Sequence, residues 1–272
     1  MRTPSPDTAP RPGEGGLPRI MVAPNGARRT KADHPALPVT DAELVACAVA
    51  CHAAGADGLH AHIRDSDGRH LLDAPRYRDL LAALREAVPG MALQITTEAV
   101  GRYDAEIQMQ VALGAGADMV SASVREIARA GTATARAFYA RCRERGIAVQ
   151  HILYDRSDGD LLAEILPPDR LHDPALQLIY VLGRYSETGL SDPADLQPFL
   201  DWASALDLTP DWALCAFGPT ETDCLRAAAR AGGKCRVGFE NSLHLSDGTL
   251  SADNADKVRD LIACLRTDGT LA

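Results

Sequence analysis

Residues 41–65 read DAELVACAVACHAAGADGLHAHIRD, and the two halves of this stretch follow different periodicities. The first half is an Ala-rich helical pattern, which Thr40 or Asp41 can cap at its start and Gly55 can end. The second half, GLHAHIRD, is a short apolar run that ends in charged residues, as a buried strand does. Another such run, RIMVAPNGA at residues 19–27, precedes the helix, so the three segments predict a β-α-β unit.

The same alternation continues along the chain. Eight candidate strands are indicated by length, flanking signals and β-branched content, and they are RIMVAPNGA (19–27), GLHAHIRD (58–65), ALQITTEA (92–99), ADMVSAS (117–123), IAVQHILY (147–154), QLIYVLG (177–183), DWALCAFG (211–218) and GKCRVGFE (233–240). Helical patterns lie between them, so we predict a single (β/α)8 barrel over residues 18–272. A doubly wound open sheet is the alternative, but it usually has fewer strands, and no GxGxxG turn opens a helix here. Residues 1–17, rich in Pro, Gly and Ser, are expected to form a disordered tail.

The composition excludes several classes of function. A net charge of −9 without a run of Lys or Arg argues against nucleic-acid binding, which needs clustered cations. No stretch is apolar for long enough to cross a membrane, and the first residues lack the apolar segment of a signal peptide. The seven cysteines form no CxxC pair and are expected to be reduced thiols. We therefore expect a cytoplasmic enzyme that acts on small molecules.

A metal site is predicted from the second strand, which carries His60-Ala-His62. Side chains alternate along a strand, so both imidazoles face one side, at the strand end where barrel active sites are built. Glu240, which ends the eighth strand, is the carboxylate best placed to complete the set, and these ligand types favour zinc while leaving manganese and cobalt open. The alternative is that each histidine is a hydrogen-bonded core residue, but the HxH spacing favours ligation. His151, on the fifth strand, is expected to face the mouth and support the metal or touch substrate.

These residues, with their surroundings, resemble the β-keto acid cleavage enzyme family, whose founding type acts on 3-keto-5-aminohexanoate. The segments that carry the resemblance are APNGARRTKADHPALPVT (23–40), HAHIRDSDGR (60–69), QITTEAVG (94–101), YVLG (180–183), CRVGFEN (235–241) and ADNADKV (252–258). The family implies a (β/α)8 barrel, usually a homotetramer, with one zinc ion per chain on the residues that match His60, His62 and Glu240. It also implies the reaction, in which a β-keto acid and acetyl-CoA give acetoacetate and a new acyl-CoA thioester.

The resemblance assigns further residues. Hydroxyls that help to hold the substrate carboxylate match Thr96 and Ser121, and Thr97 takes the place of Thr96 if the register shifts by one residue. Arg236 matches the family arginine that lies four residues before the metal-binding glutamate. Its guanidinium would orient the base or stabilise negative charge, and a structural ion pair inside the barrel is the alternative.

The sequence departs from the family at the base. The family has Glu-Asp where this chain has Glu240-Asn241, and the missing aspartate is the group that takes the α-proton. An amide cannot accept that proton. Glu98, in TTEAVG at the end of the third strand, is our candidate for the replacement, and the alternative is that Glu98 pairs with a loop arginine such as Arg102.

A second departure concerns substrate choice. Arg28 falls where the founding type carries a glutamate that faces the substrate's amino group, so an anionic or neutral side group is expected here, unless Arg28 is a solvated loop residue. Arg184 and Glu221, on loops after the sixth and seventh strands, are further candidates for substrate contacts. Two other functions stay open, namely a metal-dependent aldolase or isomerase on the same barrel and a silent homologue that binds metal and ligand without turnover.

Overall fold

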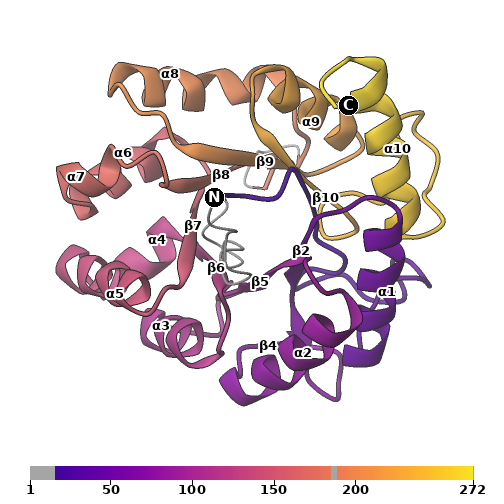
Figure 1. Ribbon diagram of the computed structural model, residues 1–272, viewed down its shortest axis with the longest axis horizontal. Coiled ribbons are helices and arrows are strands. Elements are labelled where there is room, and N and C mark those ends of the chain that lie inside the picture. The colour runs from indigo at the N-terminus through magenta and orange to yellow at the C-terminus, as the bar shows by residue number, and fades with distance from the viewer. Residues whose placement is uncertain (1–15, 185–188, 272) are drawn as a thin grey trace, which may run out of the picture.

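In the computed structural model, which describes residues 16–184 and 189–271, eight parallel strands close into a barrel inside a ring of helices (Figure 1). The predicted (β/α)8 barrel is confirmed. Most of the predicted tail, residues 1–15, lies outside the described residues. Leu17, its last residue, is buried and its amide N–H donates to the Asp211 carboxylate.

The barrel strands, in chain order, are β1 (Ile20–Val22), β2 (Gly58–Ala61), β5 (Ala92–Thr96), β6 (Met119–Ser123), β7 (Ala148–Leu153), β8 (Gln177–Leu182), β9 (Asp211–Ala216) and β10 (Lys234–Val237). Strand β1 pairs with both β2 and β10, and this closes the ring. Two short strands, β3 (Ile63–Arg64) and β4 (His70–Leu71), form an antiparallel pair beyond the end of β2.

Helices cover the outside of the barrel (Figure 1). They are α1 (Asp41–Ala53), α2 (Ala74–Ala87), α3 (Ala105–Gly114), α4 (Val124–Ile127), α5 (Thr132–Glu144), α6 (Arg156–Ile165), α7 (Pro168–Leu171), α8 (Gln197–Ala205), α9 (Glu221–Arg230) and α10 (Asn254–Thr267), with 3₁₀ turns η1 (Ala128–Ala130) and η2 (Pro193–Leu196). Helix α1 starts with a capping box in which Thr40, one of the two residues predicted as its cap, bonds reciprocally with Glu43. None of the helices that the structure describes is both long and apolar enough to cross a bilayer.

The barrel wall lies between two apolar layers, one outside and one inside, because strand side chains alternate between its two faces. The larger layer fills the space between strands and helices and includes Leu59, Ile95 and Val120. The smaller layer fills the inside of the barrel and includes Leu17, Met21 and Ile152. Above the inner layer the interior turns polar, and this change marks the position of the site.

Candidate functional site

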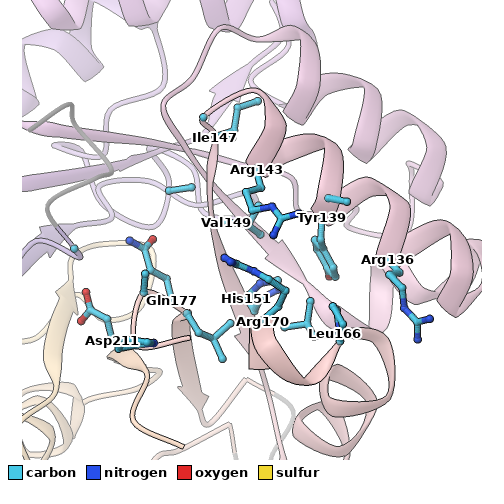
Figure 2. A pocket seen from close by; sticks show the side chains of 18 residues that line it. Arg136, Tyr139, Arg143, Ile147, Val149, His151, Leu166, Arg170, Gln177 and Asp211 are labelled. Carbon is cyan, nitrogen blue, oxygen red and sulfur yellow. The ribbon is translucent and has the colours of Figure 1, made fainter. Parts of the chain in front are cut away.

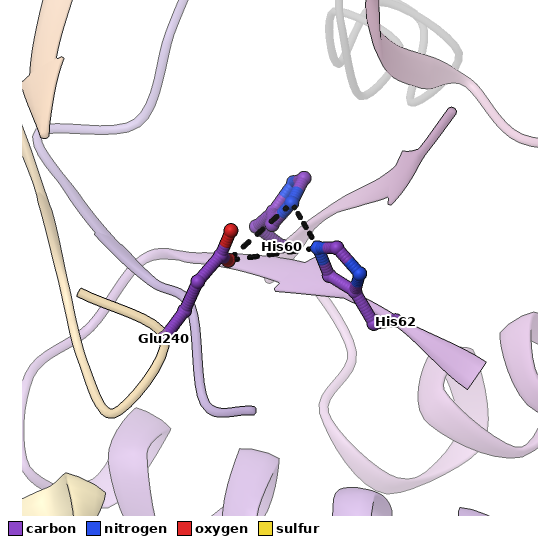
Figure 3. Close-up of side chains that lie close together, drawn as sticks. All are labelled: His60, His62 and Glu240. Carbon is purple, nitrogen blue, oxygen red and sulfur yellow. Dashed lines mark hydrogen bonds and ion pairs between the residues drawn. The ribbon is translucent and has the colours of Figure 1, made fainter. Parts of the chain in front are cut away.

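Three predicted ligand residues meet at the mouth of the barrel (Figure 3). His60 lies on β2, His62 follows in the break between β2 and β3, and Glu240 lies in the turn after β10. The Nε2 atoms of the two histidines are 3.0 Å apart, and Glu240 Oε2 lies 3.7 Å from His60 Nε2 and 3.6 Å from His62 Nε2. A Cβ on Gly26 would lie 2.6 Å from Glu240 Cγ, so a glycine is required where the β1 loop passes this carboxylate.

The turn that carries Glu240 is held by its backbone. Strand β10 ends at Val237, and Gly238 has a φ of +143°, with a Cβ position only 2.4 Å from Ala23 O. Only a glycine fits this close approach, which brings the Glu240 N–H to Ala23 O at 3.0 Å. On the far side, the Gly238 N–H donates to Glu221, a fully buried carboxylate. The glutamate is therefore positioned by a turn and not, as the sequence suggested, by a continuing strand.

A chain of buried amides determines which nitrogen of His60 carries its proton. Gln150 Nε2 donates to the backbone carbonyl of Leu178 at 3.3 Å, so Gln150 Oε1 faces the other way and accepts from Gln94 Nε2 at 2.9 Å. Gln94 Oε1 is left to accept from His60 Nδ1 at 2.7 Å. A carbonyl can only accept, so this order assigns the proton of His60 to Nδ1. The lone pair on its Nε2 consequently faces the site.

A second chain of hydrogen bonds determines which nitrogen of His62 carries its proton. His70 Nε2 donates to the backbone carbonyl of Glu98 at 2.8 Å, which leaves His70 Nδ1 as an acceptor. His62 Nδ1 lies 3.5 Å from that acceptor, a long hydrogen bond that places the His62 proton on Nδ1. Burial lowers the pKa of His70 to about 3, so this ring stays neutral. The Nε2 lone pair of His62 thus also points at Glu240.

This donor set fits a divalent cation. Burial and the charge of Arg236 hold the pKa of His60 well below its usual range, so a proton does not fill the gap between the rings. Burial by itself raises the pKa of Glu240, but the charge of the buried Arg236 counters it and helps to hold that pKa well below normal, so the carboxylate is ionised. Its Oε2 is buried without a hydrogen-bond partner among the described residues. Two imidazole nitrogens and one carboxylate oxygen form a ligand set that zinc accepts.

A small polar pocket adjoins the cluster and is continuous with it, since His60 and Glu240 are part of its wall. Its remaining walls come from six strands, β5 to β10, and the loops after them, and these residues are Thr96, Glu98, Ser121, Ile152, Tyr154, Val181, Arg184, Phe217 and Arg236. Ser121 Oγ and Arg236 Nε are buried without a hydrogen-bond partner in the described part of the chain. Buried polar atoms are normally paired, so these two atoms indicate where a polar ligand would bind.

Comparisons with known proteins place this chain in a family. The family model for beta-keto acid cleavage enzymes matches residues 19–270. The chain belongs to the β-keto acid cleavage enzyme family. It is 26% identical over 256 residues to a 3-keto-5-aminohexanoate cleavage enzyme of Fusobacterium nucleatum, covering 89% of each chain. It is also 26% identical over 257 residues to a 3-oxoadipate:acetyl-CoA acetyltransferase of Cupriavidus necator, covering 90% of this chain and 87% of that protein.

A solved structure shares the fold. ObcA, in a ternary complex with a C4-CoA adduct and oxalate, superposes with a TM-score of 0.66 at 14% identity. The match covers 86% of this chain and 65% of ObcA, so the chain spans about two thirds of that longer protein. The resemblance found in the sequence is confirmed by the family match, and so is the expectation of an enzyme.

Among the hydroxyls that the family resemblance suggests, Thr96 and Ser121 line the pocket. Thr97, the alternative for a shifted register, is turned away and its hydroxyl donates to Ser121 O at 2.8 Å. Arg236 lies inside the barrel with its Nη2 3.6 Å from Glu240 Oε1 and 3.3 Å from Cys215 Sγ. It therefore forms the ion pair that was the alternative to a functional role, and its side chain also lines the pocket that the functional role requires.

The two candidates for the proton-transfer position differ in environment. Glu98 lines the pocket and accepts from Arg184 Nη2 at 2.6 Å, so its partner is Arg184 and not Arg102, whose guanidinium donates to His70 O. Asn241 is fully buried, and neither atom of its side-chain amide has a hydrogen-bond partner among the described residues. A carboxylate thus reaches the pocket from the loop after β5, while the position that the resemblance assigns to the base holds an amide without a partner in the described part of the chain.

Three other predicted contacts lie outside the pocket. Arg28 is exposed on the loop after β1. Glu221 is buried behind the Glu240 turn and pairs with Lys257 at 2.7 Å, so it supports the turn and does not face a substrate. His151 lies on the outer face of β7, where its ring packs against Tyr139 at 4.6 Å and lines a separate cavity (Figure 2).

The relay residues were missed by the sequence reasoning. Gln94 and Gln150 lie in strand segments that we had predicted, but nothing in one sequence reveals that their amides meet. His70 had a local signal, because Asp-Ser-Asp-Gly after β3 is typical of a hairpin that turns the chain back beside its own start. That hairpin pairs Arg64 with His70 and brings the ring to His62.

Proposed function

We propose that this chain is a zinc-dependent enzyme that converts a β-keto acid and acetyl-CoA into acetoacetate and a new acyl-CoA thioester. The names of its relatives support this, since one cleaves 3-keto-5-aminohexanoate and another transfers acetyl between 3-oxoadipate and acetyl-CoA. The observation that carries the proposal is the convergence of His60 Nε2, His62 Nε2 and Glu240 Oε2 at the barrel mouth. One ion per chain, a homotetramer and a cytoplasmic location complete the proposal and come from the family resemblance.

The reaction balances without a redox cofactor. The bond between the keto carbon and the α-carbon breaks, the acyl group moves to the CoA sulfur, and the acetyl group joins the released two-carbon carboxylate. Zinc, when bound, would supply a Lewis acid that polarises the keto oxygen and favours loss of an α-proton. Arg236, buried and cationic beside Glu240, adds positive potential where negative charge develops. Thr96 and Ser121, which line the same pocket, would hold the substrate carboxylate.

We propose Glu98 as the base that takes the α-proton. Its carboxylate lines the same pocket as His60 and Glu240, and it is held in place by Arg184. Among the residues that the structure describes, the other carboxylate in the pocket wall is Glu240, which is a proposed metal ligand. Asn241 could donate a hydrogen bond to substrate but cannot accept the proton.

The side group of the substrate is proposed to be anionic or neutral. The residue that supports this is Arg184, whose guanidinium lies 5.0 Å from the Phe217 ring centroid in the pocket wall. Arg236 also lines the pocket, and with a divalent ion held by Glu240 the positive charges would outnumber the carboxylates of Glu98 and Glu240, which disfavours an amine. The exposed Arg28, on which the sequence argument rested, is not needed for this preference.

The decisive experiment incubates zinc-loaded protein with acetyl-CoA and a panel of anionic, neutral and cationic β-keto acids, with new CoA thioesters detected by mass spectrometry. A new thioester with an equal amount of acetoacetate is expected for anionic or neutral members. A best substrate with a primary or quaternary amine would overturn the proposed side group, and silence across the panel would overturn the reaction.

The buried amide of Asn241 specifically favours one second candidate, a homologue that binds metal and keto acid without turnover. Exchange of the substrate α-proton in D2O separates the two functions. The proposed enzyme exchanges this proton with zinc and keto acid alone, whereas the silent homologue binds the keto acid and leaves the proton in place. An aldolase-like enzyme would exchange the proton and cleave its substrate without CoA.

A further inference from the structure

A large cavity is lined by residues of α5 and of the strands β7, β8 and β9 (Figure 2). It encloses about 700 Å³, which is within the range of cavities that hold small organic ligands. Ala148, Gln177 and Asp211, the first residues of β7, β8 and β9, are part of its lining, so it opens below the strands' N-terminal ends. The metal cluster lies at the opposite, C-terminal ends. The cavity is therefore separate from the proposed catalytic pocket.

Three buried polar atoms on side chains of the cavity lining lack hydrogen-bond partners among the described residues. They are His151 Nδ1, the Tyr139 hydroxyl and Gln177 Oε1, on side chains that are 5%, 7% and 5% exposed. Two of them come from adjacent elements, since Tyr139 on α5 packs edge-on against His151 on β7. Buried polar groups cost free energy when they are unpaired, so atoms of this kind gathered on one cavity suggest a ligand that bonds to them.

The rest of the lining defines the chemistry of that ligand. Val149, Leu166 and Leu176 contribute apolar surface, and His151 is neutral because burial lowers its pKa to about 3. The inside of the cavity therefore suits an uncharged, largely apolar body with a few hydrogen-bonding groups.

Arginine side chains also line the cavity. Arg143, near the end of α5, is exposed and forms no ion pair with the residues that the structure describes. Two neighbours are already engaged, because Arg136 donates to the carbonyls at the end of α6 and Arg170 pairs with Asp173 at 2.7 Å. Arg143 is thus the cation available to an anionic group at the opening.

We infer that this cavity is a second ligand site that binds an amphipathic organic anion, with its apolar body against Val149, Leu166 and Leu176 and its acidic group at Arg143. The hydrogen-bonding part of the ligand would pair with Tyr139, His151 and Gln177. This inference does not depend on the proposed catalytic function, because no residue of the metal cluster or of the catalytic pocket lines the cavity.

The test uses the full-length, zinc-loaded protein and anilinonaphthalene sulfonate, a fluorescent probe with an apolar body and one anionic group. Ala140→Trp fills the cavity, because Ala140 lines it from α5. The matched control is Ala137→Trp, one turn earlier on the same helix, exposed and outside the lining. We expect saturable binding of about one probe per chain, weakened at least about tenfold by Ala140→Trp and unchanged by Ala137→Trp.

A second pair of variants tests the anion end. Arg143→Gln is expected to weaken binding about threefold or more and to reduce its salt dependence, while Arg141→Gln, on an exposed residue of the same helix outside the lining, leaves both unchanged. Equal binding by Ala140→Trp and Ala137→Trp, or no saturable binding at all, would overturn the inference. So would a change of oligomeric state confined to Ala140→Trp in sedimentation velocity, since the cavity would then be an interface between copies of the chain.

Discussion

His60 Nε2 and His62 Nε2 lie 3.0 Å apart, and both present a lone pair to the space between them. The reason lies in the opposite nitrogens, whose protons are held by Gln94 and His70. Two lone pairs at this distance repel, and a cation between them turns the repulsion into attraction. Since burial lowers the pKa of His60, a metal ion is favoured over a proton as that cation.

Metal removal is therefore expected to destabilise the fold. Stripping with a chelator should lower the unfolding temperature, and zinc at 100 times its Kd should restore about 2.7 kcal/mol of stability. His62→Ala removes one ligand and should abolish the response to zinc. Thermal unfolding with and without zinc measures both effects, and an equal zinc response in wild type and His62→Ala would show that the ion binds elsewhere.

The Gln94 relay is expected to set metal affinity without touching the metal. Gln94→Leu leaves His60 Nδ1 without its acceptor, so the other tautomer becomes available and zinc affinity should fall about 10- to 100-fold. Gln108→Leu is the matched control, because Gln108 is equally buried but bonds Thr97 O and Glu126. Chelator competition measures affinity, and imidazole ¹⁵N shifts report the tautomer. If both variants lose affinity alike, the relay has no specific role.

The sequence predicted the barrel and the metal cluster because both depend on local rules. Strand and helix periods gave the order of elements, and the two-residue period gave the shared face of His60 and His62. Closure of the ring then brought Glu240 near them, as expected from neighbouring first and last strands. No local rule could reveal the Gly238 turn, whose form depends on the carbonyl of Ala23 in a distant loop.

The misplacement of His151 has a simple physical cause. Its strand neighbour Ile152 lines the catalytic pocket, so the alternation of side chains turns His151 outward against α5. The sequence shows the alternation but not which of the two sets faces inward, since β7 has apolar and polar residues in both. Arg28 is exposed while Arg184 lines the pocket for a related reason. The paths of the loops decide which arginine reaches the pocket, and one sequence does not reveal those paths.

Replacement of the proposed base is expected to stop turnover while leaving the metal in place. Glu98→Gln keeps the shape of the side chain and removes its proton acceptor, so kcat should fall by about 10²-fold or more with zinc content unchanged. Loss of α-proton exchange in D2O should accompany it. Near wild-type turnover in Glu98→Gln would exclude Glu98 as the base.

Asn241→Asp also tests which residue acts as the base, at the position that the family resemblance assigns to that role. In the Glu98→Gln background, a carboxylate at 241 is expected to restore part of the turnover, because it returns a proton acceptor beside Glu240. The comparison is a steady-state assay of the single and double variants at equal zinc content. An inactive double variant would show that the pocket around position 241 no longer accepts a base.

Acid sensitivity is expected from His151, which lies far from the metal cluster. Burial lowers its pKa from 6.5 to about 3, so below pH 6.5 the unfolded chain binds a proton that the folded chain does not. Stability should therefore fall as the pH drops from 6.5 toward 3, by up to about 1.4 kcal/mol per pH unit for this one group.

His151→Phe removes the titrating group. The unfolding free energy of this variant, measured with urea on metal-free protein, should fall less steeply than that of wild type between pH 6 and 4. The control His172→Phe alters an exposed ring and should keep the wild-type slope. Parallel curves for wild type and His151→Phe would mean that His151 becomes protonated inside the folded protein, through water or a ligand that enters the cavity it lines.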